Sequence, residues 1–465
     1  SKVDVADIYS EKIVSKNNKL FYEYDSKLVP IIEKKITINY LENGKLIPKE
    51  FKTYFTGHGP IMAKRNGKWI SLKSNNRSMN SLVQSWVRTK SKGFEDYKKA
   101  MDLKANTSNN TVYADNKGNI AYWHGNFVPI RDKSLNWSRL IDGTTSKTEW
   151  KGLHDVLETV HSYNPTNGWL QNCNSTPFTV SGDNSPKKEN YPSYMAPDGE
   201  NFRGINAVRI LSKGEKYTLD KIIADSYDKK LSAFEVLIPS LISSFEKNIK
   251  PGDSLYTDLA EPIKNLKDWD YYSNENSVAT TLAITWASKL DPIIYTYPKY
   301  EDELDHVENT KNFAKNATYT QLLPQLQTAI NELNTIYGSW KIPWGEINRF
   351  QRLSGEINLT YNDDSKSLPI GFASALWGCL PSFVSNYQKN SKKRYGYNGN
   401  SFVCAVEFGD KIKAKSLLAG GNSGNPESKH FDDQAEMYQK GQFKDVLFYK
   451  EDVEKNTERK YHPGE

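Results

Sequence analysis

The stretch that decides the fold is YNPTNGWLQNCNSTP, residues 163–177. It opens with a turn, because the residue before Pro165 is biased away from helix and the Asn-Gly pair at 167–168 supplies the left-handed backbone of a tight turn. The apolar Trp-Leu pair at 169–170 then predicts the start of a buried strand. The stretch therefore predicts a turn and then a strand, whose end is fixed by Pro177.

Two asparagines, Asn172 and Asn174, lie on either side of Cys173 at the expected end of this strand. A side-chain amide held in one direction is a neutral donor, which is what stabilises a developing oxyanion. Asparagines in loops more often hydrogen-bond the backbone of the loop itself. Spacing alone leaves both roles open.

Composition favours a folded protein that does not bind nucleic acid. Of the 465 residues, 37% are hydrophobic and 25% are charged, which suits a globular chain with a large core. The net charge of +6 is spread along the chain without a long basic block, which gives little support to nucleic-acid binding. No run of 18 apolar residues is present, so the sequence predicts no membrane span.

Cysteine and aromatic content narrow the class further. Three cysteines, without a CxxC pair, argue against a disulfide framework and against a zinc site. The chain is rich in Tyr (28) and Trp (11), which serve cores and pockets but also carbohydrate-binding surfaces. An aromatic-rich carbohydrate-binding surface protein is therefore an alternative, and it predicts Trp86, Trp123 and Trp169 exposed on one face.

Hydrophobic periodicity predicts strands at both ends and helices between them. Alternation predicts strands at 35–40 and 51–55, and two β runs joined by Asn and Gly predict a hairpin over 110–123. Residues 81–100 are predicted as a helix with Val83, Trp86 and Val87 on its apolar face. Further segments complete the prediction: helices at 233–245, 278–290, 322–337 and 431–439, and strands at 401–408 and 415–419. We therefore expect an α+β fold whose sheet is joined by strands from both ends of the chain.

His58 lies between two glycines in a turn that leads into a strand. A histidine could act as a base, but a lone histidine in such a turn more often has a structural role. We expect a structural role here.

At this point the motifs carry a resemblance to a known family. In order along the chain, they are VDVADIYSEK at 3–12, HGP at 58–60, YAD at 113–115, GNI at 118–120, the 163–177 stretch, WGE at 344–346, and GNSGNP at 421–426 with HFDDQ at 430–434. Together they resemble the penicillin acylase (penicillin amidase) family of N-terminal-nucleophile hydrolases over nearly the whole length.

The resemblance implies a four-layer αββα sandwich with an inserted helical region. We expect three parts: residues 1–200, a strand-rich core with the site motifs; residues 201–395, mostly helical; and residues 396–465, strands and a short helix returning to the core. It also implies hydrolysis of an amide by an N-terminal serine or cysteine, which self-cleavage of a precursor exposes and whose α-amine acts as the base.

The resemblance assigns roles to individual residues. Asn174 falls on the family's oxyanion asparagine, and Arg203 falls near an arginine that supports the site. The family also binds a structural calcium ion, whose ligands fall on Asp4, Ala6 (through its carbonyl), Asp7, Trp137 (carbonyl) and Asp183. Calcium takes about six to eight oxygen ligands, so such a set is chemically reasonable.

The start of the sequence departs from the family pattern. Lys2 follows Ser1 and the aspartate motif comes at once, whereas the family nucleophile is followed by asparagine and a strand-rich opening segment. We therefore expect Ser1 not to be the nucleophile, and the chain to be truncated and to lack the attacking atom.

The expected partners are an N-acylated small-molecule substrate and a small chain from the same precursor, with neither nucleic acid nor membrane. We expect a periplasmic or secreted location. A relative that keeps the scaffold only to bind acyl groups, without catalysis, is a second alternative.

Overall fold

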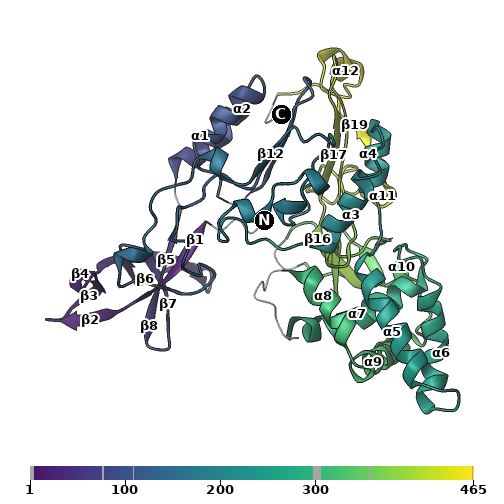
Figure 1. Ribbon diagram of the computed structural model, residues 1–465. Helices are drawn as coiled ribbons and strands as arrows, with labels where there is room; N and C mark the ends of the chain where they lie inside the picture. Colours follow the sequence, from purple (N-terminus) through teal and green to yellow (C-terminus); the bar gives the residue numbers. More distant parts are fainter. Residues whose placement is uncertain are drawn as a thin grey trace. The chain divides into compact units, whose positions relative to one another are not determined.

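A computed structural model describes residues 5–75, 78–107, 109–296, 305–356, 359–462 and 464. The chain divides into two compact units, Ser1–Asp198 and Gly199–Glu465. In Figure 1 the N-terminal unit runs from purple to blue-green and the C-terminal unit from teal to yellow.

A six-stranded mixed sheet organises the N-terminal unit. Its order is β11-β1-β8-β7-β6-β5. The strands are β1 (Ala6–Glu11), β5 (Ile32–Glu42), β6 (Lys45–Thr56), β7 (Gly59–Arg65), β8 (Lys68–Ser74) and β11 (Ile141–Asp142). Burial alternates along β1 as the pleat requires, and Asp7, Tyr9 and Glu11 are its buried positions. This sheet therefore buries two carboxylates.

The strands predicted at 35–40 and 51–55 are confirmed as parts of one long hairpin, β5 and β6. Asn43 and Gly44 both have positive φ, 51° and 74°, so they form the type I′ turn whose twist matches the two strands. β7 pairs with β6 only at Phe55 and Thr56. Beyond that point the hairpin is a two-stranded ribbon.

Two smaller sheets complete the strands of this unit. One contains β2 (Ile13–Lys16), β3 (Lys19–Tyr24) and β4 (Lys27–Pro30), and the other contains β9 (Thr111–Ala114), β10 (Ile120–Trp123) and β12 (His161–Tyr163). β9 and β10 confirm the hairpin predicted over 110–123.

The helix predicted over 81–100 is instead two helices, and its apolar face is not in the core. α1 spans Met79–Arg88 and α2 spans Phe94–Met101; Gly93, with φ 156°, separates them. Gln84 is the buried residue of α1, whereas Trp86 is 66% exposed. The reason is polar: the Gln84 side chain accepts a hydrogen bond from the Ala105 N–H at 2.8 Å, so the polar side of α1 faces the protein.

The C-terminal unit begins with a helical region, as predicted. Its helices are α3 (Phe202–Leu211), α4 (Leu219–Ser226), α5 (Ala233–Asn248), α6 (Ser254–Lys267), α7 (Val278–Thr296), α8 (His306–Asn316), α9 (Tyr319–Tyr337) and α10 (Trp344–Ile347). Leu241, Leu282, Trp286 and Leu326 are fully buried in their shared core. Within the part of the chain that is described, no helix is both long enough and apolar enough to cross a bilayer.

The strands predicted near the C-terminus are confirmed. β17 (Phe402–Glu407) and β18 (Lys413–Leu418) pair with each other and with β19 (Lys444–Asp445). A second sheet contains β13 (Asn348–Phe350), β14 (Leu368–Pro369), β15 (Phe383–Tyr387) and β16 (Arg394–Gly399), and α11 (Ala435–Lys440) is the short helix predicted at 431–439. The described strands of the C-terminal unit thus form two sheets within that unit.

One buried side chain ties α3 to the rest of its unit. Asn206 is fully buried, and its Nδ2 donates to the carbonyl oxygens of Lys230 and Gly378, each at 2.7 Å. Gly378 has φ 115°, and a Cβ there would lie 2.8 Å from the backbone nitrogen of Ser232. Three segments thus approach too closely for larger groups, and one amide satisfies two of their carbonyls.

We expect Asn206→Ala to lower the free energy of unfolding by about 2–4 kcal/mol, because two buried carbonyls lose their donor. Urea unfolding followed by circular dichroism measures the change. Asn316→Ala is the matched control: Asn316 is exposed on α8, so its removal should cost less than about 0.5 kcal/mol. Equal losses in the two variants would contradict the role of Asn206.

Candidate functional site

The loop that follows β12 is fastened at several points. Asn164 has a positive φ of 44°, and its Oδ1 accepts a hydrogen bond from the backbone N–H of Ile120 at 2.8 Å. Further along, the N–H of Gln171 donates to the Val180 carbonyl at 2.8 Å. The turn predicted at the start of this stretch is therefore anchored to β10, and the loop is closed on itself.

The strand predicted at residues 169–170 is absent, because these residues lie half-buried in the loop. The carbonyl of Trp169 accepts a hydrogen bond from the hydroxyl of Ser181 at 2.8 Å, in place of a neighbouring strand. The Ser181 hydroxyl thus replaces the backbone N–H that a neighbouring strand would donate to Trp169.

Asn172 supports the position of Asn174. Its Oδ1 accepts hydrogen bonds from the backbone N–H of Asn174 at 3.2 Å and from Nδ2 of Asn110 at 3.1 Å. Asn174 has a positive φ of 55° and is exposed. An oxyanion hole at Asn174 would thus need a further surface to exclude water from it, since such donors act most strongly where solvent is excluded. The oxyanion role stays a prediction.

Arg203 belongs to the other unit. It is the second residue of α3, whose first turn is capped by Asn201: Oδ1 of Asn201 accepts from the N–H of Gly204 at 2.8 Å. Arg203 is half-buried. The two predicted catalytic residues therefore belong to separate units of the chain, and the role of Arg203 also stays a prediction.

Asp7 on β1 is buried in an ion pair that the sequence analysis did not foresee. Its Oδ2 accepts from Nε of Arg131 at 2.9 Å and also from Nε1 of Trp150. The guanidinium of Arg131 lies over three aromatic rings, at 5.5 Å from Trp137, 5.9 Å from Trp150 and 5.6 Å from Tyr194. This aromatic cage replaces water around a buried cation.

The structure places the predicted calcium ligands as follows. Asp7 and the indole ring of Trp137 both contact Arg131, but the atom predicted to bind calcium is the Trp137 carbonyl oxygen. Ala6 and Asp183 are exposed, Asp183 on a short 3-10 turn. Asp4 lies outside the described residues. Among the residues described, no three His, Cys, Asp or Glu side chains converge to hold a metal ion.

The two carboxylate oxygens of Asp7 differ in whether they could bind a cation. Oδ2 is already compensated by Arg131, but Oδ1 is buried and has no hydrogen-bond partner among the described residues. A buried carboxylate oxygen without a partner is costly, and a cation or a water would satisfy it. Asp7 can thus offer one oxygen to calcium.

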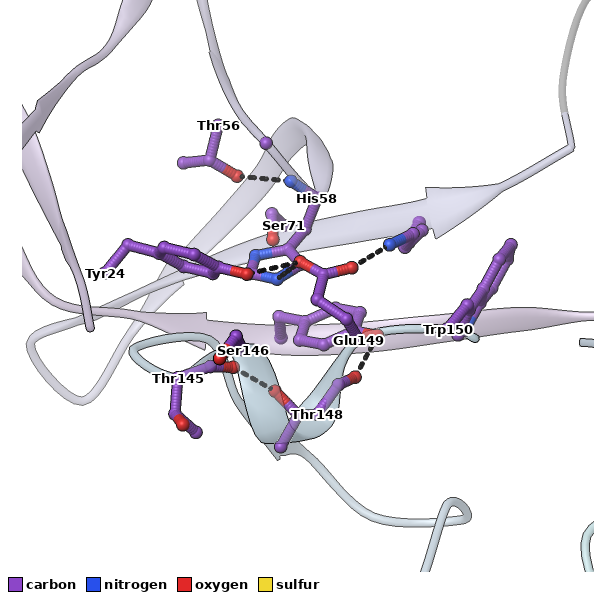
Figure 2. Close-up of polar contacts among 12 residues, drawn as sticks. Tyr24, Thr56, His58, Ser71, Thr145, Ser146, Thr148, Glu149 and Trp150 are labelled. Atoms are coloured by element: carbon purple, nitrogen blue, oxygen red, sulfur yellow. Dashed lines mark hydrogen bonds and ion pairs between the residues drawn. The ribbon is translucent and has the colours of Figure 1, made fainter. Parts of the chain in front are cut away.

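His58 lies in a buried polar cluster, shown in Figure 2. Its Nδ1 is 2.9 Å from Oε1 of Glu11, and its Nε2 is 3.0 Å from Oε1 of Glu149. Its ring stacks on Tyr9 at a centroid distance of 4.0 Å. Because both ring nitrogens are occupied by carboxylates, His58 has no nitrogen left to act as a base on a substrate, which supports the structural role we expected.

The surrounding hydroxyls and a lysine complete the cluster. Oε1 of Glu11 also accepts from the hydroxyls of Thr56 at 2.7 Å and Ser71 at 2.6 Å. Glu149 pairs with Lys73 through its other oxygen. The cluster therefore joins β1, β8, the turn before β7 and the segment after β11.

The paired charges shift the pKa values of all three groups. Burial opposes the charged form of His58, but its hydrogen bonds to Glu11 and Glu149 outweigh burial and raise the pKa of His58. Burial likewise opposes ionisation of Glu11, yet the hydrogen bonds from His58 and from two hydroxyls lower its pKa. The hydrogen bond from His58, with help from Lys73, lowers the pKa of Glu149 to about 2.

A second buried histidine, His124, was not identified from the sequence. Nδ1 of His124 lies 2.9 Å from the hydroxyl of Tyr122, and its Nε2 lies 2.9 Å from Oδ2 of Asp198. Asp198 ends the N-terminal unit, so this pair fastens the end of the unit to β10. The partners of His58, His124 and Asp7 are distant in sequence, so no local signal could have identified them.

We expect the urea midpoint of the N-terminal unit to be highest between about pH 4.5 and 6.5. The raised pKa of His58 gives stabilisation that is complete below about 6.5 and is lost as the pH rises through the folded-state value. The lowered pKa of Glu149 gives stabilisation that is present above about 4.5 and is lost as the pH falls toward about 2. Tryptophan fluorescence between pH 3 and 9 measures the midpoint.

His58→Gln is the control for this profile, because a glutamine does not titrate. The variant should lose the decline above about pH 6.5 that the natural protein shows. A natural protein whose midpoint rises steadily from about pH 6 to 8 would contradict the cluster's contribution.

Comparison with known proteins identifies a family that matches this chain and a solved structure with a similar fold. A family model described as penicillin amidase matches residues 1–455. Penicillin G acylase of Escherichia coli is 28% identical over 178 residues, which are 37% of this chain and 20% of that protein. The match thus spans about one fifth of the length of that curated relative.

A solved structure shows the same fold. A thermostable penicillin G acylase from Alcaligenes faecalis superposes with a TM-score of 0.69 and 17% sequence identity, covering 99% of this chain and 86% of that one. This likeness confirms the predicted α+β fold. Because the family model covers nearly the whole chain, the protein belongs to the penicillin amidase family.

Proposed function

We propose that the protein hydrolyses a linear amide bond in an N-acylated small molecule, such as a penicillin or an acyl-homoserine lactone, through an acyl-enzyme intermediate. The observation that carries the proposal is the family match over residues 1–455. We take Asn174 as the oxyanion asparagine from the resemblance of the 163–177 stretch to the family. The fastened loop around Asn174 supports it, because a preorganised donor need not be reoriented as charge develops.

Each proposed site residue has one task. Asn174 would donate its side-chain amide to the oxyanion, and Arg203 would support the site. The attacking group would be a serine or cysteine that uses its own α-amine as the base. An α-amine has a pKa near 8, so part of it is neutral and can accept the nucleophile's proton.

The exposure of Asn174 bears on the proposed partner. A buried, water-poor site strengthens the electrostatic effect of each donor. A small chain from the same precursor is our proposed source of the surface that encloses Asn174. Its docking would also explain why the described residues leave this asparagine exposed.

We also propose a structural calcium ion and a periplasmic or secreted location. The unpartnered Oδ1 of Asp7 supports the ion, and Ala6, Trp137, Asp183 and Asp4 are its other proposed ligands. When bound, calcium would neutralise carboxylates and fix the segments that carry them.

The aromatic-surface alternative has little support. Trp123 is fully buried, Trp169 is half-buried, and Trp86 is 66% exposed, so the three do not form one exposed face. A non-catalytic acyl-binding relative is the other alternative, and the assay below separates it from the proposal.

We expect Asn174→Ala to lower kcat for amide hydrolysis by about 100- to 1,000-fold, the usual cost of losing one oxyanion donor. The assay uses protein expressed from its complete gene and a panel of phenylacetyl, fatty-acyl and acyl-homoserine-lactone amides. Asn190→Ala, which removes another exposed asparagine of the N-terminal unit, is the matched control and should leave kcat unchanged. Substrate binding without turnover in the natural protein would favour the acyl-binding alternative.

We expect calcium to raise the melting temperature of chelator-treated protein, whereas magnesium should not, because the smaller ion demands six ligands in near-octahedral geometry. Asp183→Asn should abolish the shift, and Asp258→Asn, an exposed aspartate of α6, should retain it. A melting temperature that is insensitive to calcium in the natural protein would remove the calcium proposal.

A further inference from the structure

The β5–β6 hairpin exposes an apolar face. Successive residues of a strand point to opposite faces, so the even-numbered residues of β5 share one face with the odd-numbered residues of β6. On this face Ile36, Ile38 and Tyr40 are 44%, 51% and 42% exposed, and Phe51, opposite Ile36, is 39% exposed. An apolar surface of this kind usually marks an interaction site.

The opposite face of the hairpin carries paired charges along most of its length and two exposed leucines next to the turn, Leu41 (70%) and Leu46 (69%). Lys35 and Glu50 form an ion pair at 3.3 Å, and Glu33 and Lys52 form another at 2.9 Å. Both pairs link β5 to β6 within the hairpin, so these charges do not call for a partner. The partner must therefore be sought along the apolar face and the strand edge.

The free edge of β5 is open to pairing. β5 is the last strand of the six-stranded sheet. Glu42 and Lys45 flank the two-residue turn, and residues in this position exchange backbone hydrogen bonds. Hydrogen-bonded pairs alternate along an antiparallel ladder, so the even-numbered residues of β5 bond to β6. The odd-numbered residues of β5 point their N–H and C=O groups outward. Thr37, Asn39 and Leu41 are among the outward residues, and none of them is proline.

The outer edge of β6, by contrast, is blocked. By the same alternation its even residues point outward, and Pro48 is one of them. Proline has no N–H to donate, so it interrupts a ladder at this edge. Of the two ribbon edges, β5 is thus the one that can accept another strand.

We propose that two copies of this chain associate through antiparallel pairing of their β5 strands, with Ile38 opposite the partner's Ile38. In this register Thr37 faces the partner's Asn39, so outward N–H and C=O groups meet and form ladder hydrogen bonds. Ile36 faces the partner's Tyr40, which aligns apolar side chains on one face.

Charge complementarity selects this register. It places Lys34 opposite the partner's Glu42, twice by symmetry, and it brings no two like charges face to face. Neither Lys34 nor Glu42 takes part in an ion pair within the described part of the chain; Lys34 lies over the ring of Phe55 at 5.0 Å. In the two neighbouring registers that use the same strand edge, Lys34 would lie opposite the partner's Tyr40 or the partner's Gly44. The ion pair with the partner's Glu42 would then be lost.

The first experiment is a charge exchange, measured on the whole 465-residue chain by sedimentation at about 1–100 µM. We expect the average mass to rise with concentration from 53.1 kDa toward twice that value. Lys34→Glu alone, which sets two carboxylates face to face, should raise the dissociation constant about 10-fold or more. Adding Glu42→Lys to the same chain should restore it to within about 3-fold.

The second experiment tests the register by oxidation, in a Cys404→Ser background because Cys404 is exposed. Residue 38 and its copy form a non-hydrogen-bonded pair with Cα atoms about 4.5 Å apart, within the range of a disulfide. Ile38→Cys should therefore form a covalent dimer. Ile36→Cys, on the same face and similarly exposed, should not, since its copy lies about 13 Å away along the strand.

Three outcomes would overturn the proposal. One is a mass of 53.1 kDa at every concentration. Another is a dimer that is indifferent to Lys34→Glu and in which Ile36→Cys cross-links as readily as Ile38→Cys. The last is a monomer that binds vesicles with about 30% anionic lipid through the hairpin, which would assign the apolar face and its lysines to a membrane surface.

Discussion

Burial of negative charge on the inward face of β1 is the constraint on which the N-terminal unit depends. Asp7 and Glu11 are each 2% exposed, and an unpaired carboxylate in such a position is costly. Arg131 neutralises the first and His58 the second. The six-stranded sheet can therefore form only when segments that lie 124 and 47 residues from β1 are in place, which makes the folding of this unit cooperative.

Local patterns predicted most of the secondary structure. The 110–123 hairpin, the helices of the C-terminal unit and the β17–β18 pair follow from alternation, turn residues and helical spacing. Trp169 and Leu170 were assigned to a strand wrongly, because the hydroxyl of Ser181 satisfies the Trp169 carbonyl. A local pattern cannot show that a side chain 12 residues away will replace a ladder partner.

The sequence indicated individual residues of the candidate site, but it did not indicate which residues contact one another. The sequence placed Asn174 at the end of a strand, whereas the structure has it in a fastened loop; the resemblance supplied its role. The ion pair between Asp7 and Arg131 had no signal in the sequence, because each residue alone is an ordinary charged residue. Tertiary packing decides whether such groups meet, and this packing also governs whether Asp7 has an oxygen to spare for a cation.

The inverted orientation of α1 has a consequence for the life of the chain in the cell. Met79, Leu82 and Trp86 are 71%, 68% and 66% exposed along one side of a helix whose polar side is fastened to the protein. Holdase chaperones select such clustered apolar side chains, and the Met79 thioether is open to oxidation to the sulfoxide. The native fold therefore exposes a cluster of apolar side chains of the kind that chaperones normally bind in unfolded chains.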